Sequence, residues 1–156
     1  MSLLSNKVAL ITGASAGIGR AIALAFAAEG AAVVLNARNS APLSETVEAV
    51  CAAGGQAVSV IGDIAAPETH EALVAAAERE FGGLDIAVNN AAAVGPYLPL
   101  AEVGLEAWRE VIDTNLTGAF LGARSQIPAM LARGGGSLVF VSTFVGTSVG
   151  IPGMGV

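Results

Sequence analysis

The sequence predicts an α/β fold built on a doubly wound parallel sheet with five strands. Short apolar runs alternate with longer segments of helical periodicity, glycine or proline marks most boundaries, and small or polar residues follow each apolar run. Strands that alternate with helices at this spacing imply right-handed crossovers, which make neighbouring strands parallel. We expect one domain over residues 1–156.

Five apolar runs have the length and composition of strands that are buried on both faces of a sheet. The predicted strands cover residues 8–12, 33–35, 58–61, 84–88 and 138–141. The helical patterns between them end in glycines or begin with capping residues and proline, as helix termini do. One ends at Gly30, a second runs from Ser40 to the glycines at 54–55, a third from Pro67 to the glycines at 82–83, and a long fourth from Trp108 to Leu131.

Composition narrows the class of protein. The net charge is −6, from thirteen acidic and seven basic residues, and the basic residues are scattered, which argues against nucleic-acid and anionic-membrane partners. No apolar run approaches the roughly 18 to 20 residues of a spanning helix and no charged leader opens the chain, so we expect a cytoplasmic protein. The single cysteine, Cys51, lies on the helical stripe Leu43, Val47, Val50 and Cys51 and is expected to be a buried, inert thiol. We assign no metal ligands.

The stretch from Thr12 to Gly19, TGASAGIG, joins the first predicted strand to the first helix. Glycines let the backbone approach a ligand closely, and the unpaired N–H groups of a helix start attract anions. The predicted phosphate cradle comprises Gly13, Ser15, Ala16, Gly17, Ile18 and Gly19. Its spacing differs from the generic G-x-G-x-x-G fingerprint, so a purely structural turn is the alternative. A P-loop is excluded because no Gly-Lys-Ser/Thr follows.

Polar residues also follow the second and third strands, and ligands of doubly wound sheets bind at these carboxyl ends. Arg38, after the neutral Ala37, favours a cofactor with a 2′-phosphate, and therefore NADP(H) over NAD(H). The alternative is that Arg38 is a solvated surface charge. Asp63 either accepts a hydrogen bond from an adenine amino group or caps the loop before Pro67.

Two polar residues fall on helical patterns. Asn115 lies on an apolar face between Ile112 and Ala119, where asparagine has low helix propensity and needs buried partners. It either ties down a neighbouring backbone or has a catalytic or water-holding role. His70 is expected on a solvated helix far from the strand ends, and we assign it no function.

Together these motifs resemble the amino-terminal part of a short-chain dehydrogenase/reductase. The stretch Thr12–Gly19 matches the family's T-G-x-x-x-G-x-G cofactor motif, and Asp63-Ile64 matches its adenine-contacting aspartate. The segment Asn89-Asn90-Ala91-Ala92 is similar to its N-N-A-G, with alanine in place of the last glycine. The resemblance implies a Rossmann-like dinucleotide-binding domain in which Ile64, Asn89 and Ala91 also contact the cofactor.

The resemblance also implies an NAD(P)-dependent oxidoreductase that transfers hydride between a nicotinamide cofactor and a carbonyl or alcohol substrate. Asn115 falls at the family's catalytic-site asparagine, where it would position a water. The active-site serine position falls on Thr143, with Ser142 directly before it, and either hydroxyl could hold the substrate oxygen. The family's general acid/base is a tyrosine whose pKa a neighbouring lysine lowers from about 10.

That tyrosine and lysine would follow the fifth strand, and no Tyr or Lys follows Thr143 in this sequence. We therefore expect the domain to be incomplete at its carboxyl end; the alternative is a catalytically inactive dinucleotide-binding domain that ends at Val156. Val94, Tyr97 and Leu98 are expected to wall a moderately apolar substrate site. Family habit suggests a homotetramer or homodimer that associates through the long helix.

Overall fold

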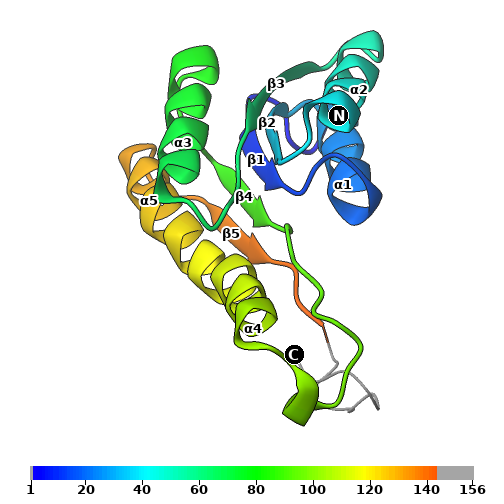
Figure 1. Cartoon of the computed structure of the whole chain (residues 1–156). Coiled ribbons are helices and arrows are strands. Elements are labelled where there is room, and N and C mark those ends of the chain that lie inside the picture. Colours follow the sequence, from blue (N-terminus) through cyan, green and yellow to red (C-terminus); the bar gives the residue numbers. More distant parts are fainter. Residues whose placement is uncertain (1, 144–156) are drawn as a thin grey trace.

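The computed structural model describes residues 2–143, and its centre is a parallel sheet of five strands in the order β3-β2-β1-β4-β5 (Figure 1). The strands are β1 (Val8–Thr12), β2 (Ala32–Ala37), β3 (Gln56–Ile61), β4 (Ile86–Asn89) and β5 (Ser137–Phe140). Every pairing is parallel, which confirms the predicted doubly wound sheet. The second and third strands begin earlier than predicted, and the fourth begins two residues later, at Ile86 rather than residue 84.

Helices cover both faces of this sheet (Figure 1). On one face lie α1 (Gly17–Ala28) and α2 (Ser40–Ala52), and on the other lie α3 (Pro67–Phe81), α4 (Leu105–Ile112) and α5 (Gly118–Ala132). Alternate residues of β1 serve the two layers, because Ala9 and Ile11 pack in one core cluster while Val8 and Leu10 pack in the other. The strand order reverses between β1 and β4, and this places a ligand crevice at their carboxyl ends.

The long helical pattern predicted from Trp108 to Leu131 is interrupted in the structure. Between α4 and α5 the chain forms a π-helical turn, η2 (Asp113–Thr117), with Asn115 at its centre. A short 3-10 helix, η1 (Leu100–Glu102), precedes α4. Single π turns inside α-helices occur frequently at functional sites. The apolar pattern of the sequence predicted one continuous helix, and it did not predict this change in the backbone.

Two burial predictions are wrong. Cys51 is exposed, because the buried residues of α2 are Leu43, Thr46 and Val50, and the next position along the helix turns away from the sheet. His70 was expected on a solvated helix, yet its exposed fraction is 1 %. The reason is that α5 lies against α3, so α3 has neighbours on the sheet side and on the α5 side.

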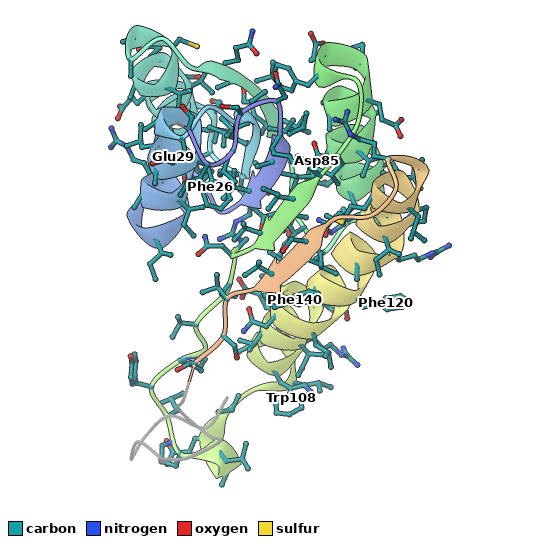
Figure 2. All side chains as sticks on the ribbon, turned by 180° about the vertical axis from the view of Figure 1, so that it is seen from behind. Phe26, Glu29, Asp85, Trp108, Phe120 and Phe140 are labelled. Atoms are coloured by element: carbon teal, nitrogen blue, oxygen red, sulfur yellow. The ribbon has the colours of Figure 1, made fainter. Side chains whose placement is uncertain are left out.

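The edge strand β5 carries partly exposed apolar side chains. Val139 and Phe140 are 42 % and 48 % exposed, and Phe120 on α5 is 61 % exposed. Figure 2 shows Trp108, Phe120 and Phe140 along the α4, α5 and β5 side of the molecule. Within residues 2–143, no helix combines the length and the apolar character that a membrane span requires.

Candidate functional site

The glycine turn between β1 and α1 is packed tightly against the chain that follows β4. Gly13 has a φ of 66°, and a Cβ placed there would lie 2.9 Å from Ala91 Cα. A Cβ on Gly19 would meet the Gly13 carbonyl and would lie 2.6 Å from the Asn90 side-chain nitrogen. Any side chain at these positions would therefore displace the turn. The turn needs glycine for both close approaches.

Thr12 and Asn90 join the ends of β1 and β4 at the point where the strand order reverses. The Thr12 hydroxyl accepts hydrogen bonds from the backbone N–H groups of Asn90 and Ala91, both at 3.0 Å. The Asn90 side-chain amide donates to the Thr12 carbonyl, also at 3.0 Å. Sequence reasoning placed both residues in motifs at strand ends but gave neither side chain a role; the available signal was a hydroxyl and an amide at two strand ends that a parallel sheet brings to one edge.

A cavity of about 540 Å³ lies beside the turn. Its lining includes Ser15, Gly17, Arg38 and Asp63, so the structure brings these predicted cofactor residues together. Arg38 is exposed and forms no ion pair with any described residue. One Asp63 carboxylate oxygen accepts a hydrogen bond from the Ala65 N–H at 2.9 Å, which shows the loop-capping contact.

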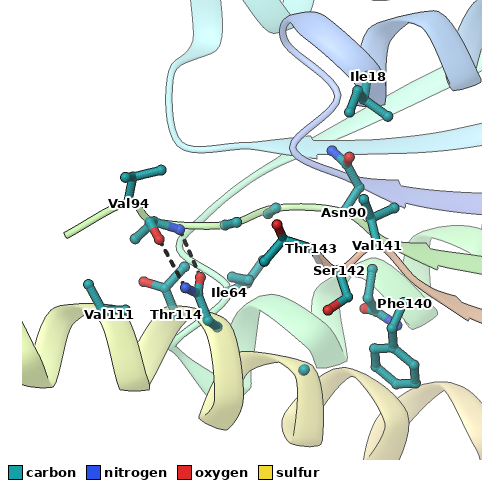
Figure 3. A pocket seen from close by; sticks show the side chains of 16 residues that line it. Ile18, Ile64, Asn90, Val94, Val111, Thr114, Phe140, Val141, Ser142 and Thr143 are labelled. Carbon is teal, nitrogen blue, oxygen red and sulfur yellow. Dashed lines mark hydrogen bonds between the residues drawn. The ribbon is translucent and has the colours of Figure 1, made fainter. Parts of the chain in front are cut away.

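Figure 3 shows a second cavity, of about 900 Å³, which adjoins the first through shared walls. The two share lining residues, namely Ile18, Ile64, Asn90, Ala91, Ala92 and Thr114. The larger one is also lined by Asn115, Ser142 and Thr143, so all three predicted catalytic residues border one space. Its described wall includes Val94 but neither Tyr97 nor Leu98, and Tyr97 is 70 % exposed.

Asn115 makes two hydrogen bonds to one backbone unit (dashed in Figure 3). The Ala93 N–H donates to Asn115 Oδ1 at 2.8 Å, and Asn115 Nδ2 donates to the Ala93 carbonyl at 2.9 Å. The structure thus shows the backbone-tying role. The expectation of buried partners is wrong, because Asn115 and Ala93 are both at the exposed wall of the cavity.

The Asn89 side chain bonds to another residue of the protein and is not free as a cofactor ligand would be. Its side chain forms a reciprocal amide pair with Gln126 of α5, with N···O distances of 2.9 and 3.1 Å. Gln126 is completely buried and was not singled out from the sequence. The pair fixes the end of β4 against α5, so the Asn89 side-chain amide is already committed to another residue.

The environment of His70 changes the pKa of its imidazole. Burial lowers the pKa of His70 below 6.5, and the hydrogen bond to the Ile64 carbonyl partly opposes that effect. The imidazole is therefore neutral at pH 7.

Comparison with known proteins identifies the family. The family model described as short chain dehydrogenase matches residues 7–156. The chain belongs to the short-chain dehydrogenase family. Members of this family use a nicotinamide cofactor, which agrees with the cofactor class that the sequence motifs imply.

Its relatives include named dehydrogenases. Cyclohexanol dehydrogenase of Acinetobacter sp. (strain SE19) is 40 % identical over 142 residues, which are 91 % of this chain and 57 % of the relative. A 2,5-dichloro-2,5-cyclohexadiene-1,4-diol dehydrogenase of Sphingobium indicum is 47 % identical over 154 residues, or 97 % of this chain and 60 % of the relative. The chain thus spans about three fifths of the length of these relatives.

Solved structures of the family have the same fold. A short-chain type dehydrogenase/reductase from Mycobacterium marinum superposes with a TM-score of 0.89 at 39 % identity, covering 96 % of this chain and 60 % of that one. A metagenomic short-chain oxidoreductase in complex with NADP gives 0.90 at 33 % identity, covering 97 % and 68 %. The Rossmann-like architecture is therefore confirmed as that of the family.

Proposed function

We propose that the protein is an NAD(P)-dependent oxidoreductase that transfers hydride between a nicotinamide cofactor and a carbonyl or alcohol substrate. The observation that carries the proposal is the pair of adjoining cavities at the switch point of the sheet. One is lined by the glycine turn and the other by hydroxyl and amide side chains. We further propose that residues 1–156 belong to a single dinucleotide-binding domain and that the protein is cytoplasmic.

The glycine turn fits a cofactor pyrophosphate, because Gly13 and Gly17 line the smaller cavity and no described atom lies within 4 Å of a Cβ at Gly17, so the backbone there is open to a ligand. In the proposal, residues Gly13 and Ser15–Gly19 hold the pyrophosphate, and Asp63 and Ile64 border the adenine. Ala91 and the backbone of Asn89 continue the wall toward the second cavity. Arg38 provides a positive charge that has no ion pair among residues 2–143 and is open to a 2′-phosphate, which supports NADP(H) over NAD(H).

In the second cavity, the hydroxyl of Ser142 or Thr143 holds the substrate oxygen. Asn115 keeps the Ala93 backbone in place and positions a water at the cavity wall. The nicotinamide cofactor supplies or accepts the hydride when it is bound. We assign no general acid or base within residues 1–156, because the single tyrosine, Tyr97, does not line the described cavity.

Alicyclic alcohols are the proposed substrate class. Two relatives are named for a cyclohexanol and for a cyclohexadiene diol. The larger cavity agrees with such substrates, since Ile64, Val94, Val111 and Phe140 give it apolar walls around a few polar groups. A ring alcohol would place its apolar body on these walls and its oxygen near the hydroxyl pair.

The test is oxidation of cyclohexanol by the purified protein with NADP⁺ or NAD⁺, followed by the near-ultraviolet absorbance of the reduced cofactor. We expect turnover with NADP⁺ and no turnover in Gly19→Ala. Tight cofactor binding without turnover of any alcohol or ketone in a broad panel would favour the inactive binding domain instead. Absence of cofactor binding would contradict both the oxidoreductase and the inactive binding domain.

A homotetramer or homodimer through the α4–α5 segment is also proposed. Support comes from exposed apolar side chains along these helices, namely Trp108, Leu116, Phe120, Ile127 and Leu131. Light scattering on wild type and on Phe120→Glu tests it. We expect an oligomer that the charged side chain dissociates, and a monomeric wild type would contradict the proposal.

A further inference from the structure

His70 lies in α3, outside both cavities, yet it contacts the loop that forms a wall of each. Its Nε2 is 2.7 Å from the Ile64 carbonyl oxygen, and the residue is 1 % exposed. A carbonyl oxygen can only accept a hydrogen bond, so the Nε2 nitrogen carries the proton. The neutral ring then has its lone pair on Nδ1, and that buried atom has no hydrogen-bond partner among the described residues.

Packing alone does not account for this imidazole. The other buried residues of α3 are Thr69, Leu73, Ala76 and Ala77, and an apolar side chain beside them would leave no unsatisfied atom. A buried nitrogen without a partner destabilises the folded chain. What histidine provides in return is a hydrogen-bond donor to the Ile64 carbonyl, which its Nε2 contacts at 2.7 Å.

The Ile64 position is restrained from three directions. From β2, the buried Asn36 side chain donates to the carbonyls of Val60 and Gly62, both at 3.1 Å, which fixes the entry to the loop. From α5, a Cβ on Gly118 would be 3.0 Å from both the Ile64 carbonyl oxygen and Ile64 Cδ1. From α3, His70 holds the same carbonyl. Ile64 lines both cavities, so its backbone position sets where they meet.

We propose that His70 is a positioning residue of the cofactor site, which holds the Ile64 carbonyl so that Ile64 and Asp63 keep their places in the cavity walls. The inference rests on the proposed function, since it needs a dinucleotide in the smaller cavity. His70 touches neither cavity and is not a catalytic residue. Its loss should weaken cofactor binding and leave turnover at saturating cofactor almost unchanged.

Glutamine and asparagine variants separate positioning from general stability. The side-chain amide nitrogen of His70→Gln extends about as far from the backbone as Nε2 does, so it can still donate to Ile64. The amide of His70→Asn is one bond shorter and cannot reach that carbonyl, and His70→Leu removes the donor while filling the space. Glu71→Gln, at the exposed neighbouring position of α3, is the matched control.

The measurement is the NADPH dissociation constant of each variant by calorimetry, together with kcat at saturating cofactor and unfolding without cofactor. We expect His70→Asn and His70→Leu to bind about tenfold more weakly, and His70→Gln to stay within about threefold of wild type. Glu71→Gln should match wild type. Near-normal binding in the glutamine variant would show that the hydrogen bond to Ile64 is what matters. If all three variants lose stability equally and bind NADPH as wild type does, the inference is wrong.

A wild-type measurement covers the case in which the variants do not fold. Because the sequence contains one histidine, its ring ¹⁵N signals can be assigned directly. We expect the Nε2–H tautomer at pH 7, and an Nδ1–H tautomer would overturn the inference. If wild type binds neither NADPH nor NADH, the proposed function fails and this inference fails with it. If wild type binds and all His70 variants bind equally well, the inference alone fails.

Discussion

Asn115 and Ala93 exchange two hydrogen bonds, of 2.8 and 2.9 Å, across the wall of the larger cavity. The bonds connect the π turn η2 to the chain that follows β4, and these segments are 22 residues apart in sequence. Asn115 lies at the centre of the π turn and lines the larger cavity. The position of the cavity wall therefore depends on one amide side chain.

Replacing Asn115 should reduce turnover more than cofactor affinity. Asn115→Leu removes both bonds to Ala93 and releases that segment, and we expect a loss in kcat of about 100-fold, the scale of a misplaced reacting group. Steady-state kinetics with cyclohexanol and NADP⁺ measures it. Asp113→Asn, an exposed change in the same turn, is the control and should behave as wild type. Equal kcat in the leucine variant would show that Asn115 has no part in the reaction.

Gly19→Ala should remove cofactor binding. The added methyl group would collide with the Gly13 carbonyl and with Asn90, so the turn cannot keep its shape. We expect NADPH affinity to fall by at least about 100-fold, equivalent to roughly 2.7 kcal/mol. Gly104→Ala is the matched control, because nothing lies within 4 Å of a Cβ at that position. Calorimetric titration of NADPH into both variants measures the two affinities and tests the prediction.

Arg38→Asp should exchange the cofactor preference. The arginine has no ion pair among residues 2–143, and a carboxylate there would repel a 2′-phosphate but accept a hydrogen bond from a ribose hydroxyl. We expect the NADPH dissociation constant to rise about tenfold or more while that of NADH falls. Arg79→Asp, which makes the same change of two charge units at an exposed site on α3, controls for net charge. A wild type that prefers NADH would contradict the assignment.

Asp85 should contribute strongly to the stability of the fold. It lies directly before β4, at the end of that strand away from the cavities. Its carboxylate accepts a hydrogen bond from Val8 N–H at 2.9 Å and lies 3.5 Å from Lys7 and 3.3 Å from Arg133. It is 8 % exposed, so Asp85→Ala leaves these donors without their acceptor, and we expect a loss of about 1–3 kcal/mol in the free energy of unfolding.

The control for Asp85 is the exposed pair of Arg79 and Glu80, at 2.7 Å. Glu80→Gln should change the free energy of unfolding by less than about 0.5 kcal/mol, because exposed ion pairs contribute little. Urea denaturation compares the two variants. Similar losses in both would mean that burial does not distinguish the two carboxylates.

Stability should decrease in acid partly through His70. Burial lowers its pKa below 6.5, so the unfolded chain takes up a proton at a higher pH than the folded chain. The contribution is complete above pH 6.5 and is lost as the pH falls from there toward the folded-state pKa. The free energy of unfolding measured from pH 7.5 downward should thus fall less steeply in His70→Gln. Parallel curves would contradict this assignment.

Features that depend on neighbouring residues were predictable from the sequence. The strand, glycine turn and α1 follow one another directly, so spacing and glycine content were enough to place the turn between β1 and α1. The strand ends that carry Arg38, Asp63 and Ser142 were also found, because a parallel sheet brings all its carboxyl ends to one edge.

Features that depend on contacts between distant segments of the chain could not be predicted from the sequence. The burial of His70 requires α5, which begins almost 50 residues later in the chain, to pack against α3. The Asn89–Gln126 pair joins residues that are 37 positions apart. The π turn at Asn115 was not predicted either, because the apolar pattern was interpreted as one continuous helix.

The most direct test of the account is a crystal structure of the protein with NADPH. We predict a pyrophosphate against the turn at residues 13–19, a 2′-phosphate within hydrogen-bond distance of the Arg38 guanidinium, and a nicotinamide ring in the larger cavity beside Asn115 and the hydroxyl pair. Density for NADPH at any other place, or its absence at saturating concentration with the carboxyl edge of the sheet unobstructed, would contradict the account.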